Sequence, residues 1–284
     1  MKFGVVYPQT QLGADPIVMR DFLQAAEDMG YHHLLVYDHV LGANPAREGW
    51  QSGRPYTYRD SFNEPFTLFA WMAALTKRIG FMTGVLILPQ RQTALVAKQA
   101  AQVDLLSGGR FRMGIGVGWN EVEYTSLGMD FRTRGARSEE QIELLRMLWT
   151  RDLVSYRGRF DTIDEAGINP LPQRPIPIWI GGTADVVLER AARMSDGWVA
   201  QSGDPQLYRD HTAKFWAYAE AEGSADRVGL HTRLSTQQVP ENDWESYVAG
   251  WAELGATELA VYPHGEELDD YLGRLRRFQE LFDL

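Results

Sequence analysis

Cysteine is absent from this sequence of 284 residues. That absence excludes disulfide bonds, thiolate catalysis, zinc–thiolate sites and iron–sulfur clusters. Long apolar runs are absent too, since none reaches the roughly 18 residues that a membrane-spanning helix needs. The first residues enter a strand-like pattern at 3–8 without a signal-type apolar region and cleavage site. We therefore expect a cytoplasmic protein with no membrane partner.

Positive charge is in deficit, with 28 Lys and Arg residues against 38 Asp and Glu residues and a formal net charge of −10. Such a balance repels a polyphosphate backbone, so nucleic acid is not an expected partner. The six histidines form no H-x-H or HExxH pattern, and the pair His32-His33 begins a predicted strand. We expect no metal site, and a metal-dependent hydrolase on the same scaffold is a minor alternative.

What the chain does contain is material for a large core, since 44% of its residues are hydrophobic. No composition shift marks a boundary, so residues 1–284 are expected to form a single domain. Strand-like apolar runs alternate with stretches in which apolar residues recur at three- and four-residue intervals. The predicted strands are 3–8, 33–38, 79–87, 110–116, 176–181, 197–201, 229–236 and 258–262. The predicted helices are 15–29, 64–77, 91–106, 137–149, 184–194, 206–222, 242–254 and 267–282.

Eight strand–helix units in unbroken alternation imply parallel strands, whose crossover helices cover the sheet. This pattern favours an α/β fold of the (β/α)8 TIM-barrel type over the alternative, a doubly wound open sheet. Two connections, 40–63 after the second strand and 117–136 after the fourth, are long enough to be binding loops. A further excursion, 154–160, predicts a small hairpin turned at Arg157-Gly158.

Asp38 and His39 follow the second predicted strand, at the end where barrels of this kind build active sites. An imidazole next to a carboxylate can donate, accept or carry a proton near neutral pH. A capping Asp and a structural His would explain the same dipeptide. The pair is therefore a candidate site with a structural alternative.

Glycines stand at three other strand ends. Gly84-Val85 interrupts the third strand, where a glycine often marks a bulge or close approach to a ligand. Gly116-Val117-Gly118-Trp119 ends the fourth strand, where backbone amides can approach a bound group. Gly181-Gly182-Thr183 precedes a helix whose free amides could hold an anion such as a cofactor phosphate. The alternatives are a narrowed barrel strand, a turn without a ligand, and a connection with Thr183 as N-cap.

In order and spacing, these segments resemble the luciferase-like monooxygenase superfamily, specifically its deazaflavin (coenzyme F420)-dependent oxidoreductase branch. The resemblance covers roughly the first 205 residues well and the remainder weakly. It implies a (β/α)8 barrel, luciferase-like, that holds a flavin or deazaflavin at the C-terminal face, and it implies a homodimer. The segments that carry it are 2–8 (KFGVVYP), 37–39 (YDH), 83–86 (TGVL), 106–110 (LSGGR), 114–119 (GIGVGW) and 179–182 (WIGG).

The resemblance assigns roles to several of these residues. It implies that His39 is the catalytic proton donor or electrostatic stabiliser beside the reactive ring carbon, and that Asp38 contacts the cofactor. Similar enzymes place a non-proline cis peptide, whose bulge backs the middle ring of the deazaflavin, where Gly84 and Val85 are joined here. The remaining expected cofactor contacts are Gly116, Val117, Gly118, Trp119, Gly181, Gly182 and Thr183.

The chain also departs from its relatives. Related deazaflavin enzymes often carry a Gly-Thr-Gly-Glu-like sequence, and this chain has Val117 for the Thr and Trp119 for the Glu that is proposed as an acid. Glu121 and Glu123 are the nearby candidates for that role. Gln201 stands where a sugar-phosphate-oxidising relative supplies a hydroxyl to its substrate, so a sugar phosphate is not implied.

Together these observations predict hydride transfer between coenzyme F420 and a small organic substrate. The alternative is an FMN-dependent two-component monooxygenase that uses reduced flavin and oxygen. Either cofactor could be recycled by a separate flavin or F420 reductase. A barrel that has lost its chemistry is a third possibility, because a fold alone never proves activity.

Overall fold

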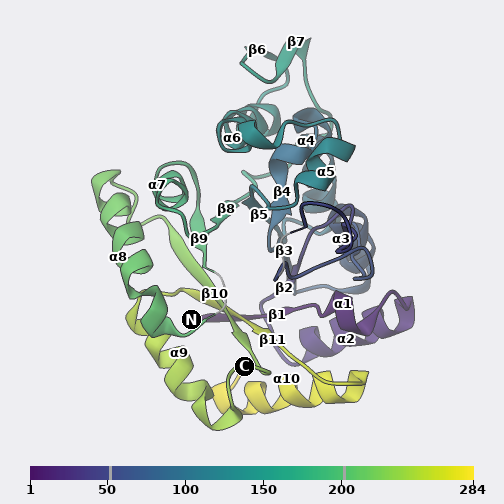
Figure 1. The fold of residues 1–284 in the computed structure, drawn as a ribbon, viewed down its shortest axis with the longest axis vertical. Coiled ribbons are helices and arrows are strands. Elements are labelled where there is room, and N and C mark those ends of the chain that lie inside the picture. Colours follow the sequence, from purple (N-terminus) through teal and green to yellow (C-terminus); the bar gives the residue numbers. More distant parts are fainter. Residues whose placement is uncertain (51–52, 201–202) are drawn as a thin grey trace.

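The computed structural model describes residues 1–50, 53–200 and 203–284 and shows a ring of strands enclosed by helices (Figure 1). In these ranges one parallel sheet has the order β3-β2-β1-β11-β10-β9-β8-β5-β4, and β3 also pairs with β5, which closes the sheet. β3 and β4 both pair with β5 and occupy one strand position, so the barrel has eight strand positions. The predicted (β/α)8 barrel is confirmed, and the open-sheet alternative is wrong. The barrel strands are β1 Lys2–Val6, β2 His33–Val36, β3 Gly80–Thr83, β4 Leu86–Ile87, β5 Phe111–Gly116, β8 Ile178–Gly181, β9 Gly197–Val199, β10 Gly229–Ser235 and β11 Glu258–Tyr262.

Eight long helices cover the outside of the strands in the described part of the chain, and each lies within about three residues of its predicted bounds. Several begin at an acidic residue whose side chain accepts a hydrogen bond from the helix amides, as Asp15 does for α2 and Glu64 for α3. The helices are α2 Pro16–Asp28, α3 Pro65–Leu75, α4 Thr93–Leu106, α6 Arg134–Thr150, α7 Asp185–Met194, α8 Pro205–Ala221, α9 Trp244–Glu253 and α10 Leu268–Phe282.

Short elements complete the connections. The long connection after β5, for which no helix was predicted, contains the helix α5 Glu121–Ser126 and the 3-10 turn η2 Phe131–Thr133. The predicted hairpin is confirmed, with β6 Val154–Arg157 paired to β7 Thr162–Ala166, and it lies beside α6 away from the barrel (Figure 1). Its turn is not at Arg157-Gly158 as predicted, because Arg157 pairs with Thr162 and the turn spans 158–161. Helix α1 Gln9–Leu12 and the turns η1 Leu88–Gln90 and η3 Glu241–Asp243 complete the set.

Two hydrophobic layers hold the barrel together. The larger lies between strands and helices and includes the fully buried rings of Phe22, Phe69 and Phe111. The smaller fills the barrel interior and consists of Val6, Leu35, Tyr37, Met82, Trp179, Val199 and Ala260. Because both faces of the strands are covered, most strand residues are apolar, as expected of a parallel sheet, and the exceptions include His33, Arg112 and Glu258.

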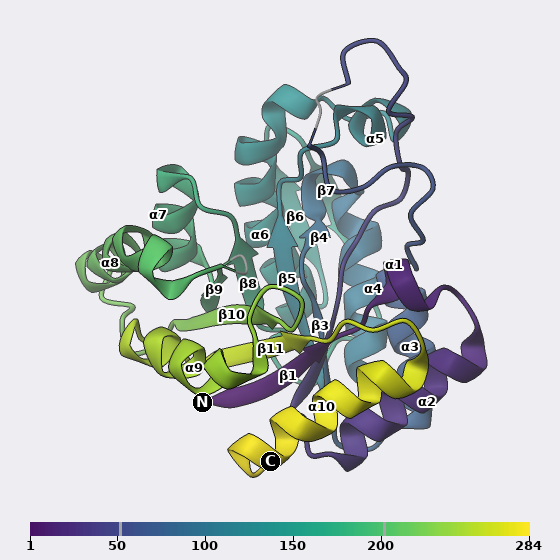
Figure 2. The same ribbon diagram turned by 60° about the horizontal axis from the view of Figure 1, so that its bottom comes forward.

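The long segment 40–63, of which 40–50 and 53–63 are described, follows the C-terminal end of β2, and its first residues lie beside α5 (Figure 2). The predicted strand 79–87 is interrupted at Gly84-Val85, whose peptide bond is cis, as the resemblance implied. Gln201 lies outside the described residues. No helix in the described part of the chain has the length and apolar character needed to span a bilayer.

Candidate active-site cleft

A cleft of about 380 Å³ lies at the C-terminal ends of the barrel strands. Its size falls within the range of small-molecule and cofactor sites. The structure brings every predicted site residue except Thr183 to this cleft, although they come from four strand ends and are spread over residues 38–182. Residues that the sequence did not single out complete the lining: Tyr37, Pro55, Tyr56, Ile87, Val199 and Arg233.

His39 is held by Glu123, which comes from α5. The His39 Nδ1 atom lies 2.9 Å from the Glu123 Oε2 atom, and the two side chains are only 9% and 1% exposed. The other Glu123 oxygen accepts hydrogen bonds from the backbone amides of Val40 and Leu41. Burial raises the pKa of Glu123, but these hydrogen bonds and the imidazole outweigh that effect and lower it. Glu123 is therefore an anion that fixes the imidazole and leaves its Nε2 atom for the cleft.

Three aromatic rings surround His39. The ring centroids of Phe62, Tyr56 and Trp119 lie 4.9, 5.4 and 5.6 Å from that of the imidazole. Trp119 is in turn covered by Trp50 at 6.2 Å and by the Arg54 guanidinium at 5.0 Å. Trp119 thus packs on the histidine, and of the two nearby candidates Glu121 and Glu123 it is Glu123 that contacts His39.

Asp38 lies under the cleft and has a side chain only 1% exposed. Its Oδ1 atom accepts a hydrogen bond from Arg91 Nη2 at 2.8 Å, and its Oδ2 atom accepts one from the Ile87 amide at 3.0 Å. Burial raises the pKa of Asp38, against the opposing effect of Arg91. The carboxylate therefore joins the end of β2 to β4 and η1. Its predicted contact with a cofactor stays a prediction.

Val85 forms part of the cleft floor, and two glycines make room for it. A Cβ atom on Gly116 would lie 2.6 Å from Val85 Cγ2, and one on Gly181 would lie 2.8 Å from Val85 Cγ1. The missing side chains of the two glycines thus accommodate Val85, while the expected approach of a ligand at Gly116 and the expected anion site at Gly181 stay predictions. Gly118 has a φ of +64°, a conformation that glycine adopts without cost.

Thr183 is not among the residues that line the cleft. Helix α7 begins at Asp185 with Ala184 as N-cap, so the alternative interpretation of Thr183 as N-cap is wrong. The first turn of α7 also carries the Asp185 carboxylate, which is paired with Lys214 at 2.9 Å. The expected phosphate contact of Thr183 stays a prediction.

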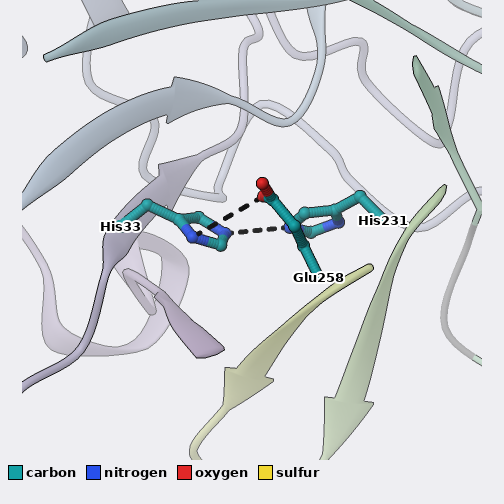
Figure 3. Close-up of side chains that lie close together, drawn as sticks. All are labelled: His33, His231 and Glu258. Atoms are coloured by element: carbon teal, nitrogen blue, oxygen red, sulfur yellow. Dashed lines mark hydrogen bonds and ion pairs between the residues drawn. The ribbon is translucent and has the colours of Figure 1, made fainter. Parts of the chain in front are cut away.

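A second polar cluster lies toward the N-terminal ends of β2 and β11. Figure 3 shows its three side chains. His33, His231 and Glu258 are buried, and their ligand atoms lie within 4.8 Å of one another, a spacing that could hold a metal ion. The two Nε2 atoms are 3.0 Å apart, so one ring donates a hydrogen bond to the other. Burial, aided by the charge of Arg112, keeps the pKa of both histidines well below the usual value.

Arg112 decides how this cluster is interpreted. Its Nη1 atom donates to both Glu258 oxygens, at 2.6 and 2.7 Å. The carboxylate is thereby compensated without a metal ion, and a divalent cation would meet the guanidinium charge. We interpret the cluster as a hydrogen-bonded polar layer inside the barrel. His33 begins β2, whereas His39 lies three residues beyond the last residue of that strand, so the two sites lie toward opposite ends of the barrel.

The chain forms a closed parallel barrel with a cleft at the C-terminal ends of its strands, and ionisable side chains line that cleft. This is the architecture of a barrel enzyme. Residues 1–283 match the family model described as luciferase-like monooxygenase, and the chain belongs to this family. The resemblance found in the sequence is thereby confirmed. Membership of this family supports an oxidoreductase.

Two curated relatives illustrate the range of similarity. The chain is 38% identical over 217 residues to an uncharacterized protein of Mycobacterium tuberculosis (strain ATCC 25618 / H37Rv), covering 73% of each chain. It is 32% identical over 218 residues to an F420-dependent glucose-6-phosphate dehydrogenase of Amycolatopsis mediterranei, covering 74% of this chain and 60% of the relative.

Among solved structures, the chain resembles an F420-dependent secondary alcohol dehydrogenase in complex with an F420-acetone adduct. The TM-score is 0.80 with 16% identity, and the match covers 98% of this chain and 97% of the other. At this identity the likeness establishes a common fold.

Proposed function

We propose that this protein transfers a hydride between coenzyme F420 and a small organic substrate. The observation that carries the proposal is the His39–Glu123 pair at the side of a cleft whose floor is formed by Val85. The F420-dependent relative and the F420-dependent structural neighbour support this choice of cofactor.

The residues of the cleft fit a planar ring system. Val85, Ile87 and Val117 provide apolar contact area, and the backbone at Gly116 to Gly118 provides polar groups close to it. Such a mixture of apolar surface and few polar groups is typical of cofactor sites. When bound, the deazaflavin would supply hydride transfer at its ring carbon.

His39 performs the proton chemistry in this proposal. Its Nδ1–H donates to the ionised Glu123, so its Nε2 atom can accept a proton from a substrate hydroxyl or return one to a carbonyl. Glu123 stabilises the charged imidazole when it holds the proton. The rings of Tyr56, Phe62 and Trp119 exclude water around it and fix its orientation.

The test is a fluorescence titration of the purified full chain with F420 and, separately, with FMN, each oxidised and reduced. We expect micromolar or tighter binding of the deazaflavin and weak binding of FMN. The reverse preference would favour a two-component monooxygenase supplied by a separate reductase. Binding of neither would overturn the proposal and favour a non-catalytic barrel.

The remaining expectations belong to the same proposal. The substrate is a small molecule, and the F420 would be recycled by a separate reductase. We also propose a homodimer, which the sedimentation velocity of the purified chain tests directly; a monomeric sedimentation coefficient at micromolar concentration would contradict it.

A further inference from the structure

Arg233 lies on β10 and lines the same cleft. Its Nη1 atom donates a hydrogen bond to the Tyr37 hydroxyl at 2.8 Å, and its guanidinium lies 5.3 Å from the centre of the Tyr37 ring. Its Nε atom is buried and has no hydrogen-bond partner among the described residues. The side chain as a whole is partly exposed, and the accessible part faces the cleft.

The charge of Arg233 is not balanced by a carboxylate in the described part of the chain, where Arg233 forms no ion pair within 4.0 Å. The other charged groups nearby are paired, Asp38 with Arg91 and Glu123 with His39. Residues 51, 52, 201 and 202, which lie outside the described ranges, are Gln or Ser and carry no charge. Arginine keeps its charge in proteins, so the cleft retains one uncompensated cation.

The neighbouring tyrosines do not neutralise this charge. Burial raises the pKa of Tyr37 and that of Tyr56, so both phenols are neutral near pH 7. The Tyr37 oxygen accepts from Arg233, which leaves its own O–H to donate. Arg112, which also faces the inside of the barrel, differs from Arg233 in that its guanidinium forms an ion pair with Glu258.

We propose that Arg233 and the Tyr37 hydroxyl bind a carboxylate of the substrate. A guanidinium matches a planar carboxylate with two parallel hydrogen bonds, and a monoanion balances its single charge. The proposal rests on the proposed function and deepens it, because it names the substrate class as small carboxylic acids.

The aromatic rings between Arg233 and His39 indicate where the reacting carbon of a bound substrate would lie. Tyr56 has its ring centroid 6.5 Å from that of Tyr37 and 5.4 Å from that of His39. A substrate held at Arg233 therefore reaches His39 across one aromatic ring. The carbon that exchanges the hydride lies a few bonds from the carboxylate.

The test uses crotonate and crotonamide, a planar acid and its uncharged analogue of the same shape. Both are titrated calorimetrically into the full chain with and without saturating F420. We expect at least ten-fold tighter binding of the acid. Arg233→Met should abolish this preference and leave F420 affinity within two-fold, and Arg233→Lys should retain part of it.

The matched control is Arg78→Met, which removes a guanidinium from a side chain that is 67% exposed and remote in the fold. It should bind both probes as the natural chain does. Equal binding of acid and amide by the natural chain would overturn the proposal. Loss of F420 affinity in Arg233→Met, without any preference for the acid, would also overturn it, because the anion would then belong to the cofactor. Failure of the proposed function differs from both, since the natural chain itself would then not bind F420.

Discussion

The Glu123 carboxylate lies 2.9 Å from the Nδ1 atom of His39, 84 positions away in the sequence. This contact joins the connection after β5 to the end of β2. It gives the imidazole one orientation and a permanent negative partner, the arrangement that lets a histidine exchange a proton through its other nitrogen.

Replacing Glu123 tests this positioning role. Glu123→Gln removes the charge and replaces one of the two acceptor oxygens with an NH2 group, so the remaining oxygen can accept from the imidazole or from the amides of Val40 and Leu41, but not from both. We expect kcat to fall about 10- to 100-fold, as is typical when the partner that orients a functional histidine is lost. Cofactor affinity, measured by fluorescence titration, should not change. Glu121→Gln, an exposed position on the same helix, is the control and should retain activity. A change in KM alone would argue against the role.

His39 itself is expected to act on the proton and not to hold the cofactor. His39→Ala should bind F420 normally and lower turnover by about 10²- to 10⁴-fold, the usual contribution of a positioned acid or base. Stopped-flow measurement of the F420 absorbance with a verified substrate provides the rate. His32→Ala removes an exposed histidine and should turn over at the natural rate. Unchanged turnover in His39→Ala would remove this residue from the mechanism.

The buried histidines predict acid sensitivity. Burial and Arg112 hold the pKa of His33 and His231 well below the usual value of about 6.5, so the unfolded chain binds protons that the folded chain does not. The free energy of unfolding should therefore fall as the pH decreases below about 6.5, by up to about 1.4 kcal/mol per pH unit for each histidine.

Urea unfolding between pH 5 and 8 measures this dependence. His33→Gln removes one of the two titrating groups and should give a shallower fall in unfolding free energy, whatever its stability at pH 8. His32→Gln makes the same change at an exposed neighbour and should leave the slope as it is. If the unfolding free energy of His33→Gln depends on pH as steeply as that of the natural chain, the lowered pKa of His33 is not the cause of the acid sensitivity.

The packing of Val85 against Gly116 gives a prediction about stability. A Cβ atom on Gly116 would lie 2.6 Å from Val85 Cγ2, so Gly116→Ala should cost about 1–3 kcal/mol of unfolding free energy through overpacking. Val85→Ala removes the clashing methyl group, and the double variant should recover most of that loss. Denaturant unfolding of the four proteins completes the cycle. Additive losses would show that the two positions do not meet.

Most of the barrel could be predicted from the sequence, because strand and helix periodicities are local properties of the chain. The approximate location of the site followed from the same information, since the C-terminal ends of parallel strands share one face. The role of Glu123 was harder to assign. Its helix α5 has only six residues, and a stretch that short carries little periodic signal.

Other features depend on contacts that no local pattern contains. His33 and His231 are 198 positions apart and meet only because β2 and β10 face each other across the interior. Arg233 occupies an inward position of β10, but its lack of a carboxylate is a property of the assembled cleft. The glycines were recognised from sequence, yet what fills the space beside Gly116 and Gly181 could be decided only when Val85 was located.

Glu123 also ties down the start of the segment 40–63, since it binds the amides of Val40 and Leu41 while Asn120 donates to the Leu41 carbonyl. Between Leu41 and Tyr56 the chain can change in length and composition without moving the imidazole, provided that Tyr56 and Phe62 keep their contacts with it. Evolution, or an engineer, can therefore replace the outer part of segment 40–63 while His39 and Glu123 keep their contact.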